Sequence, residues 1–191
     1  MRVIAGTLKG RRLDTPDWDG LRPTSDKLRE TLFNVLGTRV EGARFVDGYA
    51  GTGAVGLEAL SRGAAQVTFV EADSRAVKLI ERNLERCAVS DRYAIIRARF
   101  ADAARRLPAG TFDLVLLDPP YGPDAMTAAL EAAAPLVAPD GLLVLEHARR
   151  DAAPEHAASA SITKMRDIFS GDSALSLYRP AANGAGAPEQ A

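Results

Sequence analysis

The chain has 191 residues, the length of one ordinary domain with a substantial hydrophobic core. Hydrophobic residues make up 47% and charged residues 26%, which excludes an intrinsically disordered protein. The net charge of −1 excludes a globally basic nucleic-acid binder, and the single cysteine, Cys87, excludes an internal disulfide. No apolar run reaches membrane-spanning length and the amino terminus lacks the apolar segment of a signal peptide, so we expect a cytoplasmic protein.

Residues 1–40 are expected to form an extension of the main domain. Residues 2–21 alternate short apolar and basic segments around two glycines, which predicts a small β-hairpin outside the core. A helix is predicted over 26–37, where Thr24 and Arg29 either cover a cofactor or belong to ordinary core packing. The candidate amino-terminal caps of this helix are Thr24, Ser25 and Asp26.

From Arg44 onward, strands alternate with helices, which predicts an α/β domain over 41–180 with a doubly wound, mostly parallel, seven-stranded sheet. The tail, 181–191, has no apolar anchors and is predicted to be disordered. The predicted strands are 44–49, 66–71, 93–97, 112–117, 141–146, 161–168 and 174–179, and the predicted helices are 54–62, 74–87 and 124–137.

The apolar strand 112–117 runs directly into Asp118-Pro119-Pro120-Tyr121. A continuous hydrophobic run of this kind predicts a buried parallel strand, and ligands bind at the carboxyl edge of such sheets. The tetrapeptide offers a carboxylate, a carbonyl and an aromatic ring, which suits chemistry on the exocyclic amine of a nucleobase. A simple turn made by the aspartate and the prolines is about equally compatible with this segment alone.

A glycine-rich loop follows the strand 44–49. Its pattern Gly51-x-Gly53-x-x-Gly56, with Glu71 twenty residues beyond Gly51, formally matches a dinucleotide fingerprint, so a dehydrogenase has to be considered. However, Asp47 precedes the loop, where a carboxylate repels a diphosphate and favours a positively charged ligand such as S-adenosylmethionine. Glu71 is then expected to accept hydrogen bonds from the ribose hydroxyls. The alternatives are that Asp47 binds local amides and that Glu71 is a solvated strand end.

Taken together, these motifs resemble known methyltransferases. The segments 47–63, 67–71 and 118–121 resemble class I S-adenosylmethionine-dependent methyltransferases that act on amino groups. The segments 2–6, 9–13, 22–34 and 171–178 look like the RsmD family of bacterial 16S rRNA guanine-N2 methyltransferases. The resemblance covers residues 1–179 in the expected order. Gly48-Tyr49 and Thr52 replace a more usual Leu-Phe and Ser, and the segment 100–102 is a looser match.

The resemblance implies a Rossmann-like class I fold, S-adenosylmethionine as the cofactor and 16S rRNA, within an assembling or assembled small subunit, as the partner of a monomeric enzyme. It implies that Asp118 and the Pro119 carbonyl accept hydrogen bonds from the target amine while Tyr121 stacks on the base. The implied cofactor-binding residues are Asp47, Tyr49, Gly51, Gly53, Glu71, Ala101, Asp102 and Thr24. The candidate RNA-binding residues are Arg2, Lys9, Arg11, Arg12 and Arg22.

Other functions remain open on the sequence alone. A DNA or RNA adenine-N6 or cytosine-N4 amino-methyltransferase uses the same motifs, and a nicotinamide dehydrogenase or a catalytically silent RNA-binding module are further alternatives. Glu146 is a candidate polar group near the target. We predict no metal site. His147 is expected to be a strand-end residue and His156 an exposed one, since neither has partners for a catalytic triad.

Overall fold

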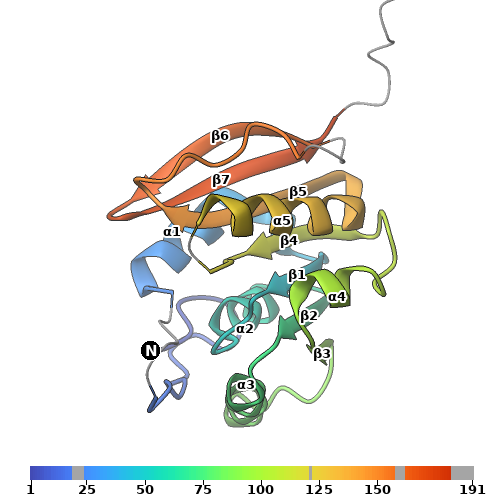
Figure 1. Ribbon diagram of the computed structural model, residues 1–191. Helices are drawn as coiled ribbons and strands as arrows, with labels where there is room; N and C mark the ends of the chain where they lie inside the picture. Colours follow the sequence, from blue (N-terminus) through green and yellow to red (C-terminus); the bar gives the residue numbers. More distant parts are fainter. Residues whose placement is uncertain (19–23, 121, 158–161, 182–191) are drawn as a thin grey trace, which may run out of the picture.

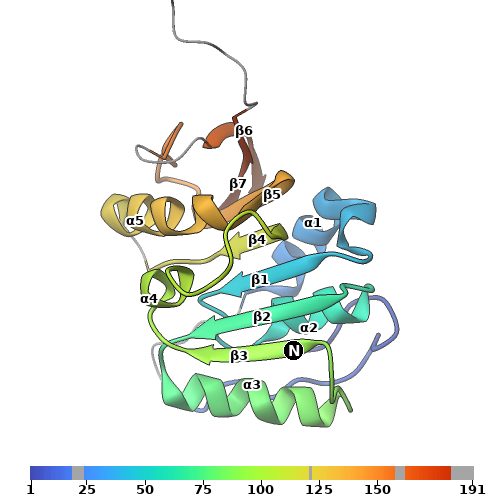
Figure 2. The same cartoon turned by 90° about the vertical axis from the view of Figure 1, so that its right-hand side faces the viewer.

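The computed structural model describes residues 1–18, 24–120, 122–157 and 162–181. Its centre is a seven-stranded sheet with the strand order β3-β2-β1-β4-β5-β7-β6 (Figures 1 and 2). Strands β1 to β5 run parallel to one another, whereas β7 is antiparallel to both β5 and β6. The predicted doubly wound, mostly parallel sheet is therefore confirmed. The strands are β1 (Arg44–Gly48), β2 (Gln66–Glu71), β3 (Tyr93–Arg97), β4 (Phe112–Leu117), β5 (Val137–Ala148), β6 (Ile162–Ser170) and β7 (Ser173–Pro180).

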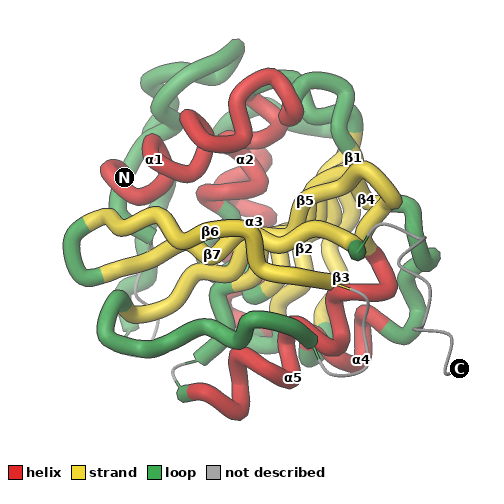
Figure 3. The backbone as a smooth tube through the Cα atoms, turned by 90° about the horizontal axis from the view of Figure 1, so that it is seen from above, coloured by secondary structure: helices red, strands yellow, loops and turns green. Residues whose placement is uncertain are grey.

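Helices cover both faces of the sheet. Figure 3 shows α1 and α2 on one side of it and α4 and α5 on the other. Side chains alternate along the strands, so Phe45 of β1 packs in the core beneath α1, α2 and α3, while Val46 packs in the core beneath α4 and α5. The helices are α1 (Asp26–Leu36), α2 (Ala54–Ser61), α3 (Ser74–Arg86), α4 (Phe100–Ala104) and α5 (Pro123–Ala133), with 3-10 turns η1 (Gly37–Val40) and η2 (Ala134–Leu136).

Local chemistry sets the helix ends. The side chain of Ser25 accepts a hydrogen bond from the Leu28 amide and caps α1, as one of the three predicted caps. The helix predicted over 124–137 is shorter than expected. It ends at Ala133 because Pro135 has no amide hydrogen to continue it, and the chain passes through η2 into β5. Strand β5 consequently begins at Val137, four residues before its predicted start.

The amino-terminal segment differs from its prediction. Arg2 and Arg12 form a single antiparallel bridge, and the Val3 amide donates to the Arg11 carbonyl at 2.9 Å, so the hairpin pairing exists. Val3 and Leu13, however, are 1% and 5% exposed and belong to the core cluster that contains α1 and α2. The expectation of a hairpin outside the core was wrong, because Val3 and Leu13 pack in the core with residues of α1 and α2.

A buried ion cluster ties this segment to α1 and α2. The Arg29 side chain is fully buried, and its Nη2 donates to the Arg2 carbonyl at 2.8 Å and to Asp26 at 2.6 Å. The buried carboxylate of Glu58 lies 3.6 Å from Arg29 Nη1 and accepts hydrogen bonds from the Ile4 and Ala5 amides, of which the Ile4 bond measures 2.7 Å. Arg29 is therefore a core residue, and its alternative role in covering a cofactor was wrong.

Within the described ranges, no helix combines the length and the apolar character needed to cross a lipid bilayer.

Candidate active site

Three carboxyl groups meet where the strand order reverses. Asp47 is near the end of β1, Asp118 follows β4, and Glu146 is near the end of β5. These strands are adjacent, and the register pairs Asp47 with Leu116 of β4. The chain winds from β1 toward β3 in one direction and from β4 toward β5 in the other. The space between β1 and β4 is therefore the switch point at which open α/β sheets bind their ligands.

A cavity of about 930 Å³ opens beside Asp118. Pro119 and Glu146 line it from the ends of β4 and β5, and Thr24 lines it from just before α1, while its contact with a cofactor stays a prediction. The turn between β6 and β7, residues 170–173, also lines the cavity. The volume lies in the range of about 300–1,000 Å³ that is usual for small-ligand sites. The cavity can therefore hold a planar base next to the Asp118 carboxylate.

The glycine loop begins next to Asp118, which lines this cavity. The Asp118 amide donates to the Gly48 carbonyl at 3.4 Å, which joins the end of β4 to the start of the loop. Gly51 and Gly53 have φ angles of 54° and 75°, in the left-handed region that favours glycine, and Tyr49 adopts a φ of 64° between them and β1. The loop therefore turns sharply between β1 and α2.

The third glycine of the apparent dinucleotide fingerprint has a packing role. A Cβ atom on Gly56 would lie 2.2 Å from the Phe69 ring, so glycine is needed for α2 to approach β2 closely. The Gly56 amide, at the start of α2, donates to the Asp47 carboxylate at 2.8 Å. This helix terminus, where a dinucleotide's pyrophosphate would bind, is thus already occupied by a carboxylate. The geometry therefore argues against the dehydrogenase alternative. Asp47 does bind a local amide, which was the second interpretation of this residue.

Glu71 lies beside the same loop. Its Oε2 accepts from the Gly51 amide at 2.9 Å and its Oε1 from the Asp73 amide at 2.8 Å. Each carboxylate oxygen can accept two hydrogen bonds, so one acceptor position on each oxygen remains for a ribose hydroxyl. The interpretation of Glu71 as a merely solvated strand end does not hold, because its carboxylate fixes the loop. Its contact with ribose stays a prediction.

The electrostatics of the site favour a cation. Burial, together with the charges of Asp118 and Glu71, raises the pKa of Asp47 to about 8, although the Gly56 amide opposes the rise. Burial raises the pKa of Asp118 to about 6. Burial, Asp118 and Asp47 raise the pKa of Glu146 to about 8. Because ionised carboxylates at this distance repel one another, a positively charged ligand bound between the three groups would make their ionisation more favourable.

The segment 100–102, the looser match of the sequence, lies in α4. The Tyr49 and Phe100 rings lie 5.4 Å apart between centroids and 30° from parallel, and a Cβ atom on Gly48 would clash with Phe100. Ala101 and Asp102 are in the first turn of α4, where Asp102 pairs with Arg105. The five-residue helix was too short to be predicted from periodicity. Its two candidate contacts remain predictions.

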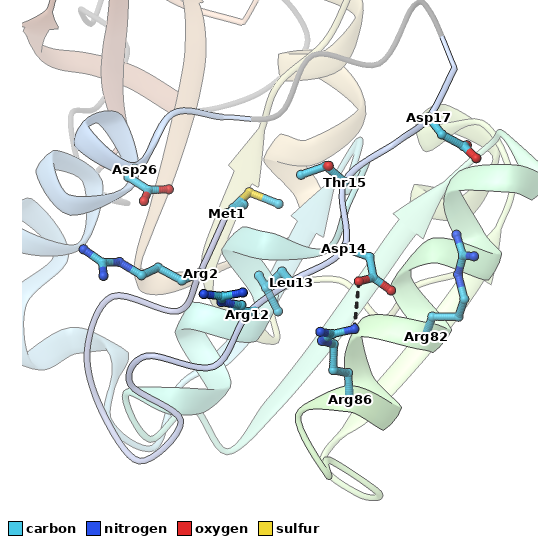
Figure 4. Close-up of a pocket in the computed structure, with 10 residues that line it drawn as sticks. All are labelled: Met1, Arg2, Arg12, Leu13, Asp14, Thr15, Asp17, Asp26, Arg82 and Arg86. Atoms are coloured by element: carbon cyan, nitrogen blue, oxygen red, sulfur yellow. Dashed lines mark hydrogen bonds and ion pairs between the residues drawn. The ribbon is translucent and has the colours of Figure 1, made fainter.

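The amino-terminal basic residues lie around a second cavity. Arg2 and Arg12 line a space of about 740 Å³ together with Arg82 and Arg86 of α3, and Arg86 pairs with Asp14 at 3.0 Å (Figure 4). The two cavities are separated by the first turn of α1, since Ser25, Lys27 and Leu28 line the first and Asp26 lines the second. Lys9 and Arg11 are exposed on the same segment.

The sequence analysis missed the contribution of α3 to this surface. Its basic residues recur at helical spacing, which would have revealed one basic stripe along the helix. The four residues are Arg75, Lys78, Arg82 and Arg86.

Comparison with known proteins assigns the family. The model of a family described as conserved hypothetical protein 95, the RsmD family, matches residues 1–179. The chain belongs to this family. Curated relatives include two proteins named ribosomal RNA small subunit methyltransferase D. The Haemophilus influenzae protein is 39% identical over 123 residues, which cover 63% of this chain and 64% of the relative. The Escherichia coli protein is 39% identical over 122 residues, covering 63% and 60%.

Other relatives match over more of their length. YlbH of Bacillus subtilis, named a putative rRNA methyltransferase, is 35% identical over 171 residues, which cover 86% of this chain and 91% of the relative. Among solved structures, Escherichia coli yhhF superimposes with a TM-score of 0.82 at 30% identity, covering 96% of this chain and 99% of yhhF. A Thermus thermophilus protein gives a TM-score of 0.76 at 29% identity, covering 94% of this chain and 99% of its own. The predicted family and the Rossmann-like methyltransferase fold are confirmed.

Some predicted residues of the RsmD pattern cannot be placed. Tyr121 and Arg22 lie outside the described residues. Both histidines fit their expected roles. His147 is buried, with its Nε2 2.8 Å from the Ser176 hydroxyl on the neighbouring strand, and His156 is exposed. Among the described residues, no group of three or more His, Cys, Asp or Glu side chains is arranged to hold a metal ion.

Proposed function

We propose that this member of the RsmD family transfers a methyl group from S-adenosylmethionine to the exocyclic N2 amine of a guanine in small-subunit rRNA. The observation that carries the proposal is the position of Asp118 and Pro119, which line the cavity at the switch point directly beside the glycine loop. Two curated relatives are named ribosomal RNA small subunit methyltransferase D, which supports this substrate class.

The residues present suit the cofactor. S-adenosylmethionine supplies a methyl group activated by its positively charged sulfur. Asp47 and Asp118 provide the negative surroundings that such a cation needs, and Glu71 has acceptor positions left for ribose hydroxyls. No phosphate group is required by this ligand, which agrees with the Asp47 carboxylate at the start of α2.

Asp118 and Pro119 would act on the target amine. The lone pair of a guanine amine is delocalised into the ring, so the nitrogen is a poor nucleophile. The Asp118 carboxylate and the Pro119 carbonyl can accept its two N–H groups, favour a tetrahedral nitrogen and stabilise the positive charge that develops on it. Holding the amine in line with the methyl group supplies a further part of the rate enhancement. Since a stacked base cannot reach this cavity, the target guanine must be unstacked or lie in a loop.

The basic surface supports RNA as the substrate. Four arginines and three aspartates line the cavity on the other side of the first turn of α1, and the exposed Lys9 and Arg11 of the amino-terminal segment add positive charge nearby. A local basic surface of this kind fits a phosphate backbone that passes the active site, and such contacts give salt-dependent affinity without base specificity. We propose that the protein acts in the cytoplasm, as a monomer, on small-subunit rRNA within the assembling or assembled subunit.

A second candidate is methylation of an adenine N6 amine. A Caenorhabditis elegans relative named rRNA N(6)-adenosine-methyltransferase metl-5 is 30% identical over 102 residues, which cover 52% of this chain and 48% of the relative. Adenine and guanine both present an amine, so Asp118 and Pro119 alone do not choose between them.

The test is to incubate the protein with radiolabelled S-adenosylmethionine and either naked small-subunit rRNA or small ribosomal subunits, both from cells that lack the protein, and then to map the modified nucleoside by mass spectrometry. We expect a single N2-methylguanosine in the small-subunit rRNA. Label on adenosine would favour the second candidate. Absence of transfer both to naked RNA and to subunits would refute the proposed function.

A further inference from the structure

Glu146 lies next to Asp118 but is not used by the methyl-transfer chemistry described above. Leu117 of β4 is paired with Leu145 of β5 in the sheet. Asp118 directly follows Leu117, and Glu146 directly follows Leu145. Neighbouring strands lie about 4.8 Å apart, which puts the two carboxyl groups side by side. Both residues line the 930 Å³ cavity.

The Glu146 carboxyl differs from three other acids of the fold in its hydrogen bonding. Asp47, Glu58 and Glu71 all accept hydrogen bonds from backbone amides. Within the described part of the chain, no hydrogen-bond donor reaches the Glu146 side chain, which is half-buried at the wall of the cavity. Its acceptor positions are therefore available to a ligand, and a base that displaces water from them has to supply an N–H group in its place.

The nucleobase edge beside the reacting amine decides which base can supply that donor. In guanine, N1 carries a hydrogen and is bonded to C2, the carbon that bears the N2 amine. In adenine, the ring nitrogen next to the amine-bearing carbon has a lone pair and no hydrogen. With the amine held at Asp118, a neighbouring carboxylate therefore accepts a hydrogen bond from guanine and repels the lone pair of adenine.

We propose that Glu146 is a specificity-determining residue, which accepts a hydrogen bond from N1–H of the target guanine while Asp118 and Pro119 hold its N2 amine. This inference rests on the proposed function and explains how one cavity distinguishes a guanine from an adenine. The ionised carboxylate is the discriminating form. A bound cofactor cation favours that form by offsetting the neighbouring charges of Asp118 and Asp47.

The experiment replaces the target guanosine with 2-aminopurine riboside in a semi-synthetic small-subunit RNA, assembled into subunits where activity requires it. 2-Aminopurine keeps the reactive N2 amine but has a lone pair at N1. The kcat/KM for each base is measured with the wild-type protein and with Glu146→Ala. We expect the wild type to prefer guanine by about 10- to 100-fold, as for a hydrogen bond to a charged group, and Glu146→Ala to lower this preference to within a few-fold.

Two variants control for indirect effects. Glu146→Gln has nearly the same size, but its amide can accept from guanine N1–H or donate to the 2-aminopurine lone pair, so it should also lower the guanine preference without opening a cavity. Asp151→Ala removes another carboxylate that lines the same cavity and should leave the preference unchanged. If Glu146→Ala unfolds, as judged by its melting temperature and its binding of S-adenosylhomocysteine, then Glu146→Met, of similar volume, replaces it.

The outcomes separate the inference from the proposed function. If the Glu146 variants slow both bases equally, or keep the wild-type preference, Glu146 does not read N1–H and the inference is overturned. The same holds if Asp151→Ala lowers the preference as strongly. If the wild type itself fails to methylate guanine in any small-subunit substrate, it is the proposed function that fails.

Discussion

Asp118 is the residue on which the proposed chemistry depends most. Its contacts with the amine strengthen as positive charge develops on nitrogen, so they act on the transition state more than on cofactor binding. We expect Asp118→Ala to lower turnover by about two to three orders of magnitude, as for removal of other groups that stabilise developing charge. Single-turnover methylation measures this loss, and calorimetry should show nearly unchanged affinity for S-adenosylhomocysteine.

Asp113 provides a matched control for that variant. It lies on the same strand at the opposite end, where its exposed carboxylate accepts a hydrogen bond from the Arg44 amide. Asp113→Ala should leave turnover near the wild-type rate. Wild-type turnover in Asp118→Ala would show that the motif has no part in catalysis.

Glu71 should determine cofactor affinity. Its carboxylate fixes the Gly51 amide and is predicted to bind ribose, so Glu71→Ala should weaken S-adenosylhomocysteine binding by about 1–3 kcal/mol. Calorimetry measures this change. NADH binding by the wild type, with none of S-adenosylhomocysteine, would instead return the loop to the dehydrogenase alternative.

At the scale of elements, the cluster of Arg29 and Glu58 joins α1, α2 and the amino-terminal segment. Both side chains are fully buried, and Glu58 also accepts from Arg62 at 2.7 Å. Glu58→Ala would leave the Arg29 charge buried without its partner on α2 and two backbone amides without their acceptor. We expect a loss of about 3–5 kcal/mol in the free energy of unfolding, measured by urea denaturation. Glu41→Ala, on the exposed loop after η1, should change it by less than about 0.5 kcal/mol.

The basic cavity beside α1 makes a prediction about RNA affinity. Arg12 and Arg82 come from different elements and line the same space. Affinity for RNA falls as salt rises. If both arginines contact phosphates, Arg12→Ala and Arg82→Ala should each make this fall less steep, by somewhat under about 1 unit in the slope of log affinity against log salt. Filter binding at several salt concentrations measures the slope. The exposed Arg106, on the loop after α4, is the control. Equal slopes for all three variants and the wild type would show that this surface does not bind RNA.

The sequence predicted most elements because each carried its own local signal. Strands β2, β3 and β4 were predicted at their observed ends, since continuous apolar runs and flanking turn residues bound them. The motif Asp118-Pro119 was placed correctly at a strand end. What local patterns could not show were contacts between distant segments, such as the burial of Val3 in the core that contains α2. Such packing depends on how the segments come together in space, which sequence periodicity does not encode.

At the scale of the whole molecule, the three carboxyls of the active site make the stability of the folded protein depend on pH. Their pKa values are raised to about 8 for Asp47, about 6 for Asp118 and about 8 for Glu146, mainly by burial. A carboxyl whose pKa is higher in the folded state than in the unfolded chain favours folding fully below its unfolded value of about 4. That contribution is lost as the pH rises through the folded-state values of about 6 to 8. The ligand-free protein should therefore lose stability over this interval.

A bound cation reverses this effect, because it favours the ionised carboxylates and releases their protons. S-adenosylmethionine has one more positive charge than S-adenosylhomocysteine. We therefore expect the affinity for S-adenosylmethionine to rise between about pH 5.5 and 8, and to rise more steeply than that for the product, which lacks the sulfonium charge. Calorimetry in buffers of different ionisation enthalpy measures both the affinities and the protons released. Glu146→Gln, which removes one of the three titrating groups, should flatten the dependence. Equal pH dependence for the two ligands would show that the carboxyls do not sense the sulfonium charge.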